Sequence, residues 1–201
     1  MFLHSFKNII FHTTEDERLI KKAQQLQHDV FLEKGYIKHP FPNKIMPLPS
    51  YVKKSVYVVA SKGSTVLGTL IISKVSSPSD VFRDWEIKNR KCQELLRKIS
   101  QMRFAEVGRL AVKRKFRDQK ISGGLYKACW LYALLKGIKW YLIKMDKEVF
   151  KSFQKFGWYS KIIAPPKFYM GSITVPAVIE IEKQLSHVYK KNFEFYKYLV
   201  S

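Results

Sequence analysis

The stretch FAEVGRLAVKRKFRDQKISGGL, from Phe104 to Leu125, gives the clearest indication of how this chain folds. Its first nine residues are mostly apolar and have the length of a strand in a central sheet. Five cations then lie between Lys113 and Lys120, and a helical pattern of apolar residues follows. We expect the inward face of this helix to be formed by Leu125, Ala128, Leu131, Tyr132 and Leu135.

A strand, a basic turn and a helix in this order predict a binding site for an anion. The first turn of a helix has free backbone N–H groups, and the helix dipole adds positive potential at the same end. Together with the cations of the turn, these groups favour a phosphate at the start of the helix.

The residues around this turn resemble the donor-binding loop of the GNAT acyltransferases. In that family a strand and an aromatic residue are followed by Gln/Arg-x-x-Gly-x-Gly/Ala, whose amides hold the phosphates of coenzyme A or phosphopantetheine. Here Phe116 is followed by Arg117, and Lys120 and Ser122 take the places of the first glycine and the small residue. The Lys120 side chain either crowds a coenzyme A pyrophosphate or contacts a single phosphate directly. The donor-binding residues that the resemblance implies are Leu110, Val112, Arg114, Arg117, Gln119, Lys120 and Ser122.

Two later segments resemble one branch of this family, the N-acyl amino acid synthases, and more distantly the acyl-homoserine-lactone synthases. Residues 148–158 resemble the late helix with its aromatic-Gly-aromatic end, and residues 165–183 resemble the closing strands. Both groups of enzymes carry Glu-x-x-Arg on the central strand, which corresponds to Glu106 and Arg109 here. The resemblance covers about residues 15–183.

This resemblance implies an α/β (α+β) fold of the GNAT type. We expect a mixed central sheet flanked by helices, in which two parallel strands splay apart and the thioester lies in the gap. The second of these strands is expected at residues 138–145, parallel to the first because a helix crosses between them. The length fits a single domain over residues 1–201. From about residue 185 follows an aromatic and basic tail, for which packing on the domain, membrane contact and base stacking are the alternatives.

The segments before the central strand predict a helix, a loop and a hairpin. Thr14 and Glu17 form a capping-box pattern that opens a helix with Leu19, Ala23, Leu26 and Val30 on one face, and His28 is expected on its surface. The proline-rich residues 36–54 are expected to be a loop that either covers the core or closes over a lipid-like chain. The strands of the hairpin and the one or two helices that follow it are predicted at residues 55–60, 65–73 and 81–101.

The chemistry of acyl transfer assigns roles to the Glu-x-x-Arg pair. A backbone amide near residues 110–112, freed by the splay, is expected to bind the thioester oxygen, and Glu106 is expected to accept the amine proton. Strand alternation places Glu106, Gly108 and Leu110 on one face and Arg109 on the other, unless a bulge intervenes. Arg109 then pairs with an acidic helix residue or the acceptor carboxylate, or else the two charges form a buried structural network.

Aromatic residues near the late helix are candidates for an acyl pocket. Phe150, Phe153 and Trp158 offer apolar surface suited to a fatty chain, although a plain aromatic core explains the same residues. Phe153 stands where many acetyl-transferring GNAT enzymes place a tyrosine as general acid. We therefore expect the leaving thiol to be protonated by water, by Tyr159 or not at all before its release.

The charge of the chain indicates an acidic partner. Its 37 Lys and Arg residues exceed its 16 Asp and Glu residues, which leaves a net charge of +21. Such an excess predicts binding to nucleic acid, an anionic membrane surface or an acidic protein, or is simply a basic surface. Acyl carrier proteins are acidic, so the donor that the resemblance implies would meet this charge directly.

The two cysteines and the chain start carry little further information. Cys92 and Cys129 have neither metal-site nor disulfide spacing, so we expect no metal and two buried thiols. The apolar run near Met1 is too short and too polar for a signal peptide, and we expect a cytoplasmic protein with no permanently bound cofactor.

Three classes of function fit these observations. The favoured one is an N-acyltransferase that moves a medium or long fatty acyl group from acyl carrier protein, or from acyl-CoA, to the amine of an amino acid or similar small molecule. The second is an acetyl-CoA-dependent GNAT N-acetyltransferase. The third is a non-catalytic basic module that binds nucleic acid or membrane. Of these partners, nucleic acid is the least expected, while peripheral membrane contact stays open.

Overall fold

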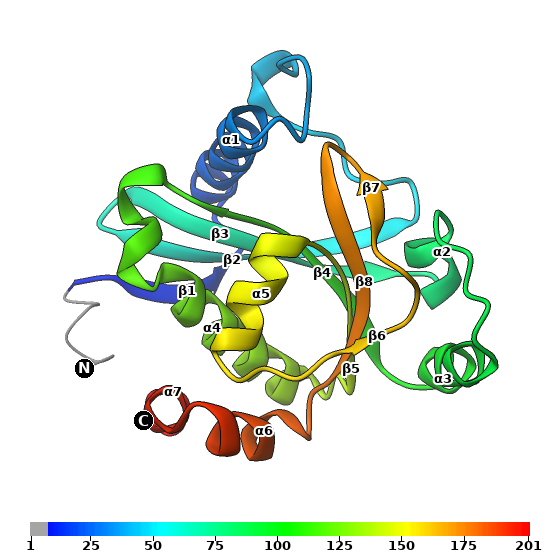
Figure 1. Cartoon of the computed structure of the whole chain (residues 1–201). Coiled ribbons are helices and arrows are strands. Elements are labelled where there is room, and N and C mark those ends of the chain that lie inside the picture. Colours follow the sequence, from blue (N-terminus) through cyan, green and yellow to red (C-terminus); the bar gives the residue numbers. More distant parts are fainter. Residues whose placement is uncertain (1–7) are drawn as a thin grey trace.

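Eight strands form one sheet in the computed structural model, which describes residues 8–201 apart from the side chains of Asp118 and Gln119. The strand order is β1-β2-β3-β4-β5-β8-β6, with β7 paired to β8 (Figure 1). Among these strands, β4 and β5 pair in parallel across the helix α4, and the other pairs are antiparallel. The mixed sheet flanked by helices, as expected from the sequence, is confirmed. The strands are β1 (Ile10–Thr14), β2 (Val52–Lys62), β3 (Thr65–Val75), β4 (Phe104–Val112), β5 (Trp140–Asp146), β6 (Lys161–Ile162), β7 (Lys167–Tyr169) and β8 (Ser172–Glu180).

Helices cover both faces of the sheet. One face packs against α4, α5, α6 and α7, and the other packs against α1, α2 and α3. The C-terminal tail therefore forms α6 and α7, which contribute Val188, Phe195 and Leu199 to the same core as α4. The helices are α1 (Glu17–Glu33), α2 (Pro78–Phe82), α3 (Arg90–Ser100), α4 (Ile121–Lys136), α5 (Lys147–Lys155), α6 (Gln184–Lys191) and α7 (Phe193–Val200), with short 3-10 turns η2 (Pro42–Lys44) and η3 (Arg114–Gln119). Within the described chain, no helix is long and apolar enough to cross a membrane.

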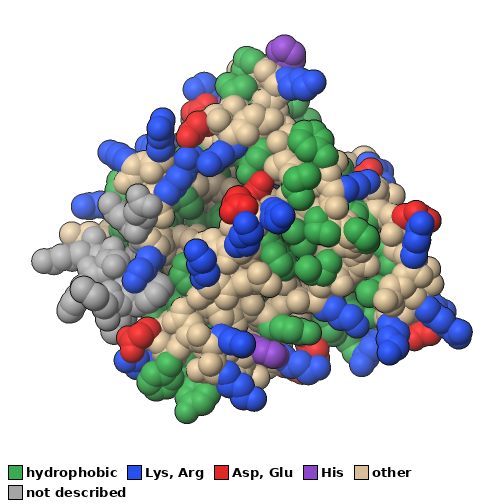
Figure 2. Space-filling view, in the orientation of Figure 1, with side chains coloured by type: hydrophobic (Ala, Val, Ile, Leu, Met, Phe, Trp, Pro, Cys, Tyr) green, Lys and Arg blue, Asp and Glu red, His purple; other side chains and the backbone are tan. Residues whose placement is uncertain are grey.

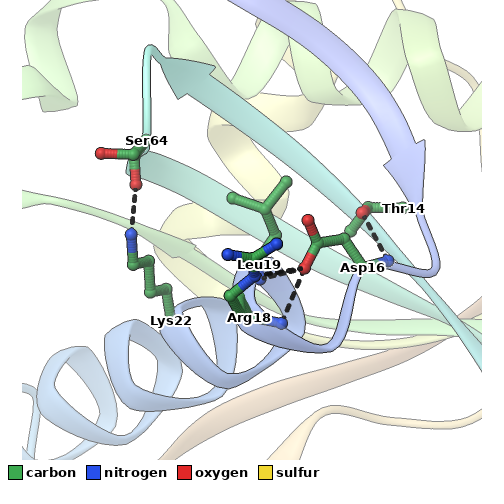
Figure 3. A network of polar contacts seen from close by, with 6 residues as sticks. All are labelled: Thr14, Asp16, Arg18, Leu19, Lys22 and Ser64. Atoms are coloured by element: carbon green, nitrogen blue, oxygen red, sulfur yellow. Dashed lines mark hydrogen bonds and ion pairs between the residues drawn. The ribbon is translucent and has the colours of Figure 1, made fainter.

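The start of α1 differs from the predicted capping box. Asp16 caps the helix, and its Oδ1 accepts hydrogen bonds from the backbone N–H groups of Arg18 and Leu19 at 2.8 and 3.4 Å (Figure 3). The Oγ1 of Thr14 instead accepts from the N–H of Asp16 at 3.1 Å, because Thr14 is the last residue of β1. A strand had not been predicted here. Further along α1, Lys22 donates to the carbonyl of Ser64 and ties the helix to the β2–β3 turn.

The inward face of α4 is rotated from the one that the sequence predicted. The helix buries Leu125, Tyr126, Cys129, Trp130 and Ala133, whereas Leu131 and Leu135 are exposed, the latter by 80%. The cause lies in the glycine pair at the start of the helix. A Cβ on Gly124 would overlap the ring of Phe11, and one on Gly123 would meet Phe156 at 2.9 Å. Because these aromatic rings pack against the glycines, the glycine side of the helix faces the core.

The parallel strands β4 and β5 separate halfway along their length. Their register runs from Phe104 opposite Trp140 to Val107 opposite Ile143 and ends there. Both strands continue beyond that point, so residues 108–112 pair with β3 but have no strand partner on the β5 side in the part of the chain described. The splayed pair that we expected is therefore present.

A β-bulge lies in the splayed part of β4. Thr69 on β3 stands opposite Ala111, and Ile71 stands opposite Gly108, so two residues of β4 face one residue of β3. The backbone of Arg109 has a φ of 54°, in the left-handed region that non-glycine residues seldom adopt.

Candidate active site

A cavity of about 210 Å³ opens at the splay between β4 and β5. The sheet is interrupted there, and side chains from both of its faces line the space. Its apolar wall comes from the strands and from α4 and α5, and its polar wall comes from β3, β4, β5 and β8 together with the loop after α1. The apolar wall includes Leu70, Val107, Leu110, Tyr126, Met145 and Val149, and the polar wall includes Tyr51, Ser73, Glu106, Arg109, Lys144 and Thr174.

The bulge brings Glu106 and Arg109 to the same cavity. Ala105 packs with α4, whereas Ala111 packs against α1 on the opposite face, although unbroken alternation over six residues would place them together. The phase of the strand therefore changes between them. As a result, Arg109 lines the cavity together with Glu106. Leu110 packs on the α4 side of the sheet, and not on the face of Glu106 where strict alternation would place it.

Glu106 forms a polar cluster with Lys144 and Tyr51. The Nζ of Lys144 lies 3.2 Å from Oε1 of Glu106 and donates a hydrogen bond to the hydroxyl of Tyr51 at 2.8 Å. The Tyr51 hydroxyl donates in turn to Oε1 of Glu106 at 3.4 Å. Because the Glu106 and Lys144 side chains are only 14% and 12% exposed, this ion pair is screened less than a surface pair would be.

Tyr51 stays a hydrogen-bond donor in this environment. Burial raises the pKa of Tyr51 well above its ordinary value, and the nearby charge of Glu106 raises this pKa further. The phenol is therefore protonated at neutral pH.

Neither Lys144 nor Tyr51 was named from the sequence as a functional residue. The sequence does mark Lys144, because it is a charged residue inside the apolar run IKWYLIKM. It lies two residues after Leu142, which stands opposite Glu106 in the parallel pair of strands. Alternate residues of β5 share a face, so this register alone places Lys144 beside Glu106. Tyr51 lies on the proline-rich loop, whose path no pattern in the sequence specifies.

Arg109 fastens the loop that follows α1. Its Nη1 donates to the carbonyl of Met46 at 3.0 Å, and its Nη2 donates to the carbonyl of Pro47. Its own carbonyl accepts from Nε2 of Gln27 on α1 at 3.1 Å. Burial lowers the pKa of the Arg109 guanidinium, while the neighbouring Tyr57 and Glu106 oppose that shift. The structure thus places Arg109 between the strand and the loop, with loop carbonyls as its described partners.

The same loop is held from α1 by His28, which is buried rather than on the surface as expected. The His28 side chain is 1% exposed, and its Nε2 accepts a hydrogen bond from the N–H of Phe41 at 3.1 Å. Its Nδ1 lies 3.1 Å from Oδ1 of Asp29. Sequence reasoning missed this burial because it depends on the loop folding back over α1. Held in this way, the loop contributes Tyr36, Leu48 and Pro49 to the cavity wall.

The β7–β8 turn lines the cavity next to the loop that follows α1. Gly171, at the turn, has a φ of 80°, and a Cβ there would overlap the carbonyl of Gly35 at the end of the α1 segment. Only a glycine lets these two backbones approach so closely. Figure 1 shows the tip of the hairpin beside the loop that follows α1.

The predicted donor loop lies between β4 and α4, at one end of the cavity region. Lys120 adopts the left-handed conformation, with φ 56° and ψ 22°, directly before the first turn of α4. Its backbone therefore has the shape that a glycine would take at this position. Ser122 lies half-buried in that first turn, and Arg114 is exposed on η3. The side chain of Gln119 lies outside the described residues.

Arg117 joins the donor loop to α1. Its Nη1 and Nη2 each lie 2.8 Å from a carboxylate oxygen of Glu33, and its Nε donates to the carbonyl of Val112 at 3.1 Å. These hydrogen bonds from Arg117 hold the pKa of Glu33 below its ordinary value. Arg117 therefore positions η3 relative to α1 and to Val112, the last residue of β4.

Phe150, Phe153 and Trp158 lie behind the cavity and do not line it. All three are buried in the core formed by α4, α5 and α7. The Phe153 ring meets Tyr126 edge-on at 5.2 Å and stacks on Trp158 at 5.8 Å, so Phe153 supports a wall residue from behind. Tyr159 is exposed and stacks on His187, and it does not line the cavity.

The two thiols are buried, as predicted. Burial raises the pKa of the Cys129 thiol to about 12, which suppresses the reactive thiolate. Over the described residues, no group of three His, Cys, Asp or Glu side chains is placed to hold a metal ion.

Comparison with known proteins places these features in one family. Residues 22–180 match the family model described as N-acyl amino acid synthase FeeM. Among curated proteins, no sequence matches this chain.

Several solved structures share the fold. A CoA-dependent acyl-homoserine lactone synthase, BjaI, solved with SAM and isopentyl-CoA, is 18% identical with a TM-score of 0.67, over 93% of this chain and 89% of that one. FeeM, an N-acyl amino acid synthase from uncultured soil microbes, is 13% identical with a TM-score of 0.65, over 92% and 97% of the two chains. An N-acetyltransferase assigned in Lactobacillus plantarum is 15% identical with a TM-score of 0.58, over 86% and 97%.

Proposed function

Because this chain belongs to the FeeM family of N-acyl amino acid synthases and is an acyltransferase, we propose that it moves a medium or long fatty acyl group from acyl carrier protein to the amine of an amino acid. The observation that carries this proposal is the position of Glu106, which lines a two-sided cavity at the splay of the parallel strands. There it can reach an amine that approaches a thioester lying in the gap.

The splay supplies the group that polarises the thioester. Residues 108–112 have no strand partner toward β5, so backbone N–H groups on that side are free for a ligand within the described sheet. A fixed N–H donor directed at the carbonyl oxygen stabilises the negative charge that grows on it during attack.

Glu106 moves the proton in this mechanism. The amine nitrogen attacks the thioester carbon, Glu106 takes a proton from that nitrogen, and the carbon–sulfur bond then breaks. Glu106 returns the proton to the departing thiolate, so no separate acid is needed at the position of Phe153. Lys144 assists the first step, since its positive charge disfavours the protonated form of an amine bound nearby.

The apolar wall holds the acyl chain. A cavity of about 210 Å³ has room for about seven groups of the size of a water molecule. We propose that a medium-length chain fits between Val107, Leu110 and Tyr126, and that a longer chain extends toward the mouth. The carboxylate of the acceptor lies on the polar wall, where Arg109 and Lys144 supply positive charge.

The cations around the cavity support a carrier protein as donor. Exposed lysines and arginines lie along η3 and α5. The helix α5 begins directly after Asp146, which lines the cavity. Figure 2 shows Lys and Arg side chains around the hollow beside α5. An acidic carrier protein docked on this surface would deliver its phosphopantetheine arm to the start of α4. The exposed cations in question are Lys113, Arg114, Lys115, Lys147, Lys151 and Lys155.

Thiol release from a panel of donors tests this proposal. Octanoyl and palmitoyl groups are presented on acyl carrier protein, on coenzyme A and on uncharged pantetheine, beside acetyl-coenzyme A, with a mixture of amino acids as acceptors. We expect the highest kcat/KM with the carrier-protein donors, and a KM that rises with salt for these donors but not for the pantetheine thioesters.

Other outcomes identify other functions. Turnover with acetyl-coenzyme A alone would select an ordinary N-acetyltransferase. No turnover with any donor, together with salt-sensitive nucleic-acid binding, would select the binding module.

A further inference from the structure

The outer part of the sheet carries an apolar strip that is open to solvent. On β8, Ile173 shares a face with Val175 and Ala177, because alternate residues of a strand point the same way. The latter two are buried in the core, whereas Ile173 is exposed. The register sets Phe168 opposite Ile173, and Ile162 opposite Ala177, so all of these side chains lie on one face. The apolar strip consists of Ile162, Phe168 and Ile173 with Met170 at the adjoining turn, and Phe168 is 71% exposed.

The apolar strip adjoins the cavity. Met170 belongs to the strip and also lines the cavity. Its neighbours Tyr169 and Ser172 line the cavity as well. The close approach of Gly171 to Gly35 fixes the β7–β8 turn against the segment that follows α1. The strip therefore lies on a hairpin whose position is fixed.

Positive charge flanks the apolar strip. The helix α5 packs on the same face of the sheet as the strip and exposes Lys147, Lys151 and Lys155. Lys161 and Lys167 follow the opposite face of their strands, where Nζ of Lys167 lies over the Trp85 ring. Figure 2 shows hydrophobic side chains gathered over β7 and β8 with Lys and Arg side chains on either side. The chain as a whole carries +21. A partner that suits this surface presents negative charge at its surface and an apolar interior just beneath.

We propose that the apolar strip binds the surface of an anionic lipid membrane, with Phe168 and Ile173 in the acyl boundary and the exposed lysines of α5, on the same face of the sheet, among the headgroups. A strand-edge hairpin that exposes large apolar residues beside cations matches this layered partner better than a polar protein surface. The contact is peripheral. A role of this membrane contact in releasing an acylated product from the cavity rests on the proposed function. Membrane binding by the strip does not rest on it.

Vesicle binding tests the proposal directly. The full chain is sedimented with vesicles of equal parts phosphatidylcholine and phosphatidylglycerol, and with pure phosphatidylcholine vesicles. We expect binding to the anionic vesicles that weakens with salt, and Phe168→Ser should lower the partition coefficient roughly tenfold through the loss of one buried aromatic side chain. The matched control is Leu135→Ser, because Leu135 is an exposed apolar residue on α4, outside the strip.

Three results would overturn the membrane assignment. The first is equal sedimentation of wild type with and without anionic lipid. The second is an equal loss of binding in Leu135→Ser and Phe168→Ser. The third is a wild-type dimer that Phe168→Ser converts to a monomer without changing vesicle binding, which would make the strip a contact between two copies. Acyl transfer from a water-soluble donor is measured for each variant, so that failure of the proposed function is recognised separately.

Discussion

Glu106 has two polar neighbours, which have different roles in the proposed reaction. Tyr51 remains protonated and its O–H donates to Glu106, whereas Lys144 brings a positive charge 3.2 Å from the carboxylate. An ammonium ion bound beside Lys144 is destabilised relative to the neutral amine, which is the nucleophile. We propose that the lysine therefore raises the fraction of reactive amine at neutral pH.

Lys144→Met should shift the acidic limb of the kcat profile, which reports ionisation in the bound complex, to higher pH by about one unit, because the charge that favours the neutral bound amine is lost. At pH 7 this corresponds to roughly a tenfold fall in kcat. Lys144→Arg keeps the charge and should keep the wild-type profile. A profile for Lys144→Met with unchanged shape and reduced height would mean that Lys144 acts only in packing.

At the scale of elements, three short segments position the site. The bulge in β4 turns Arg109 toward the proline-rich loop, and the left-handed Lys120 joins η3 to α4. Arg117 fixes η3 to the end of α1 through its paired contacts with Glu33. The donor loop thus depends on an ion pair that lies between two separate elements.

Glu33→Gln should raise the KM for the acyl donor a few-fold while kcat stays near wild type, since it releases η3 from α1. The effect on stability should be at most about 1 kcal/mol, because both side chains are partly exposed. Since Arg117 lowers the pKa of Glu33 in the folded state, the stabilisation from this pair is present above the ordinary carboxyl pKa. It is lost as the pH falls through the lowered value.

Glu94→Gln provides the matched control for this prediction. Glu94 pairs with Arg90 four residues away on α3 and lies away from the donor loop, and its side chain is 52% exposed, against 38% for Glu33. An equal change in donor KM in both variants would contradict the positioning role of the Glu33–Arg117 pair.

The same elements show what the sequence could and could not predict. The strand-turn-helix from Phe104, the hairpin before it and the parallel strand after it follow from local periodicity, and the structure has them. The bulge, the orientation of α4 and the burial of His28 do not, because each depends on a partner far away in the chain. The ring that rotates α4 comes from Phe11 on β1, and His28 is covered by Phe41.

At the scale of the molecule, the site is a consequence of sheet topology. A parallel pair flanked by antiparallel strands leaves a gap where its two strands diverge, and helices on both faces close the gap into a cavity. The fold class and the position of Glu106 could therefore be read from motif order. The apolar wall of the cavity could not, since Phe150, Phe153 and Trp158 are apolar like the residues that line the cavity but lie one layer behind them.

The most direct test of the central claim is mass spectrometry of N-acyl amino acid formed by wild type and by Glu106→Gln, with octanoyl-carrier protein as donor and mixed amino acids as acceptors. The glutamine is nearly isosteric and keeps hydrogen-bonding contact with Lys144 and Tyr51, so the fold should be retained. We predict N-acyl product from wild type and a rate lower by at least about 100-fold in the variant. Equal rates of product formation by a folded Glu106→Gln would contradict the account.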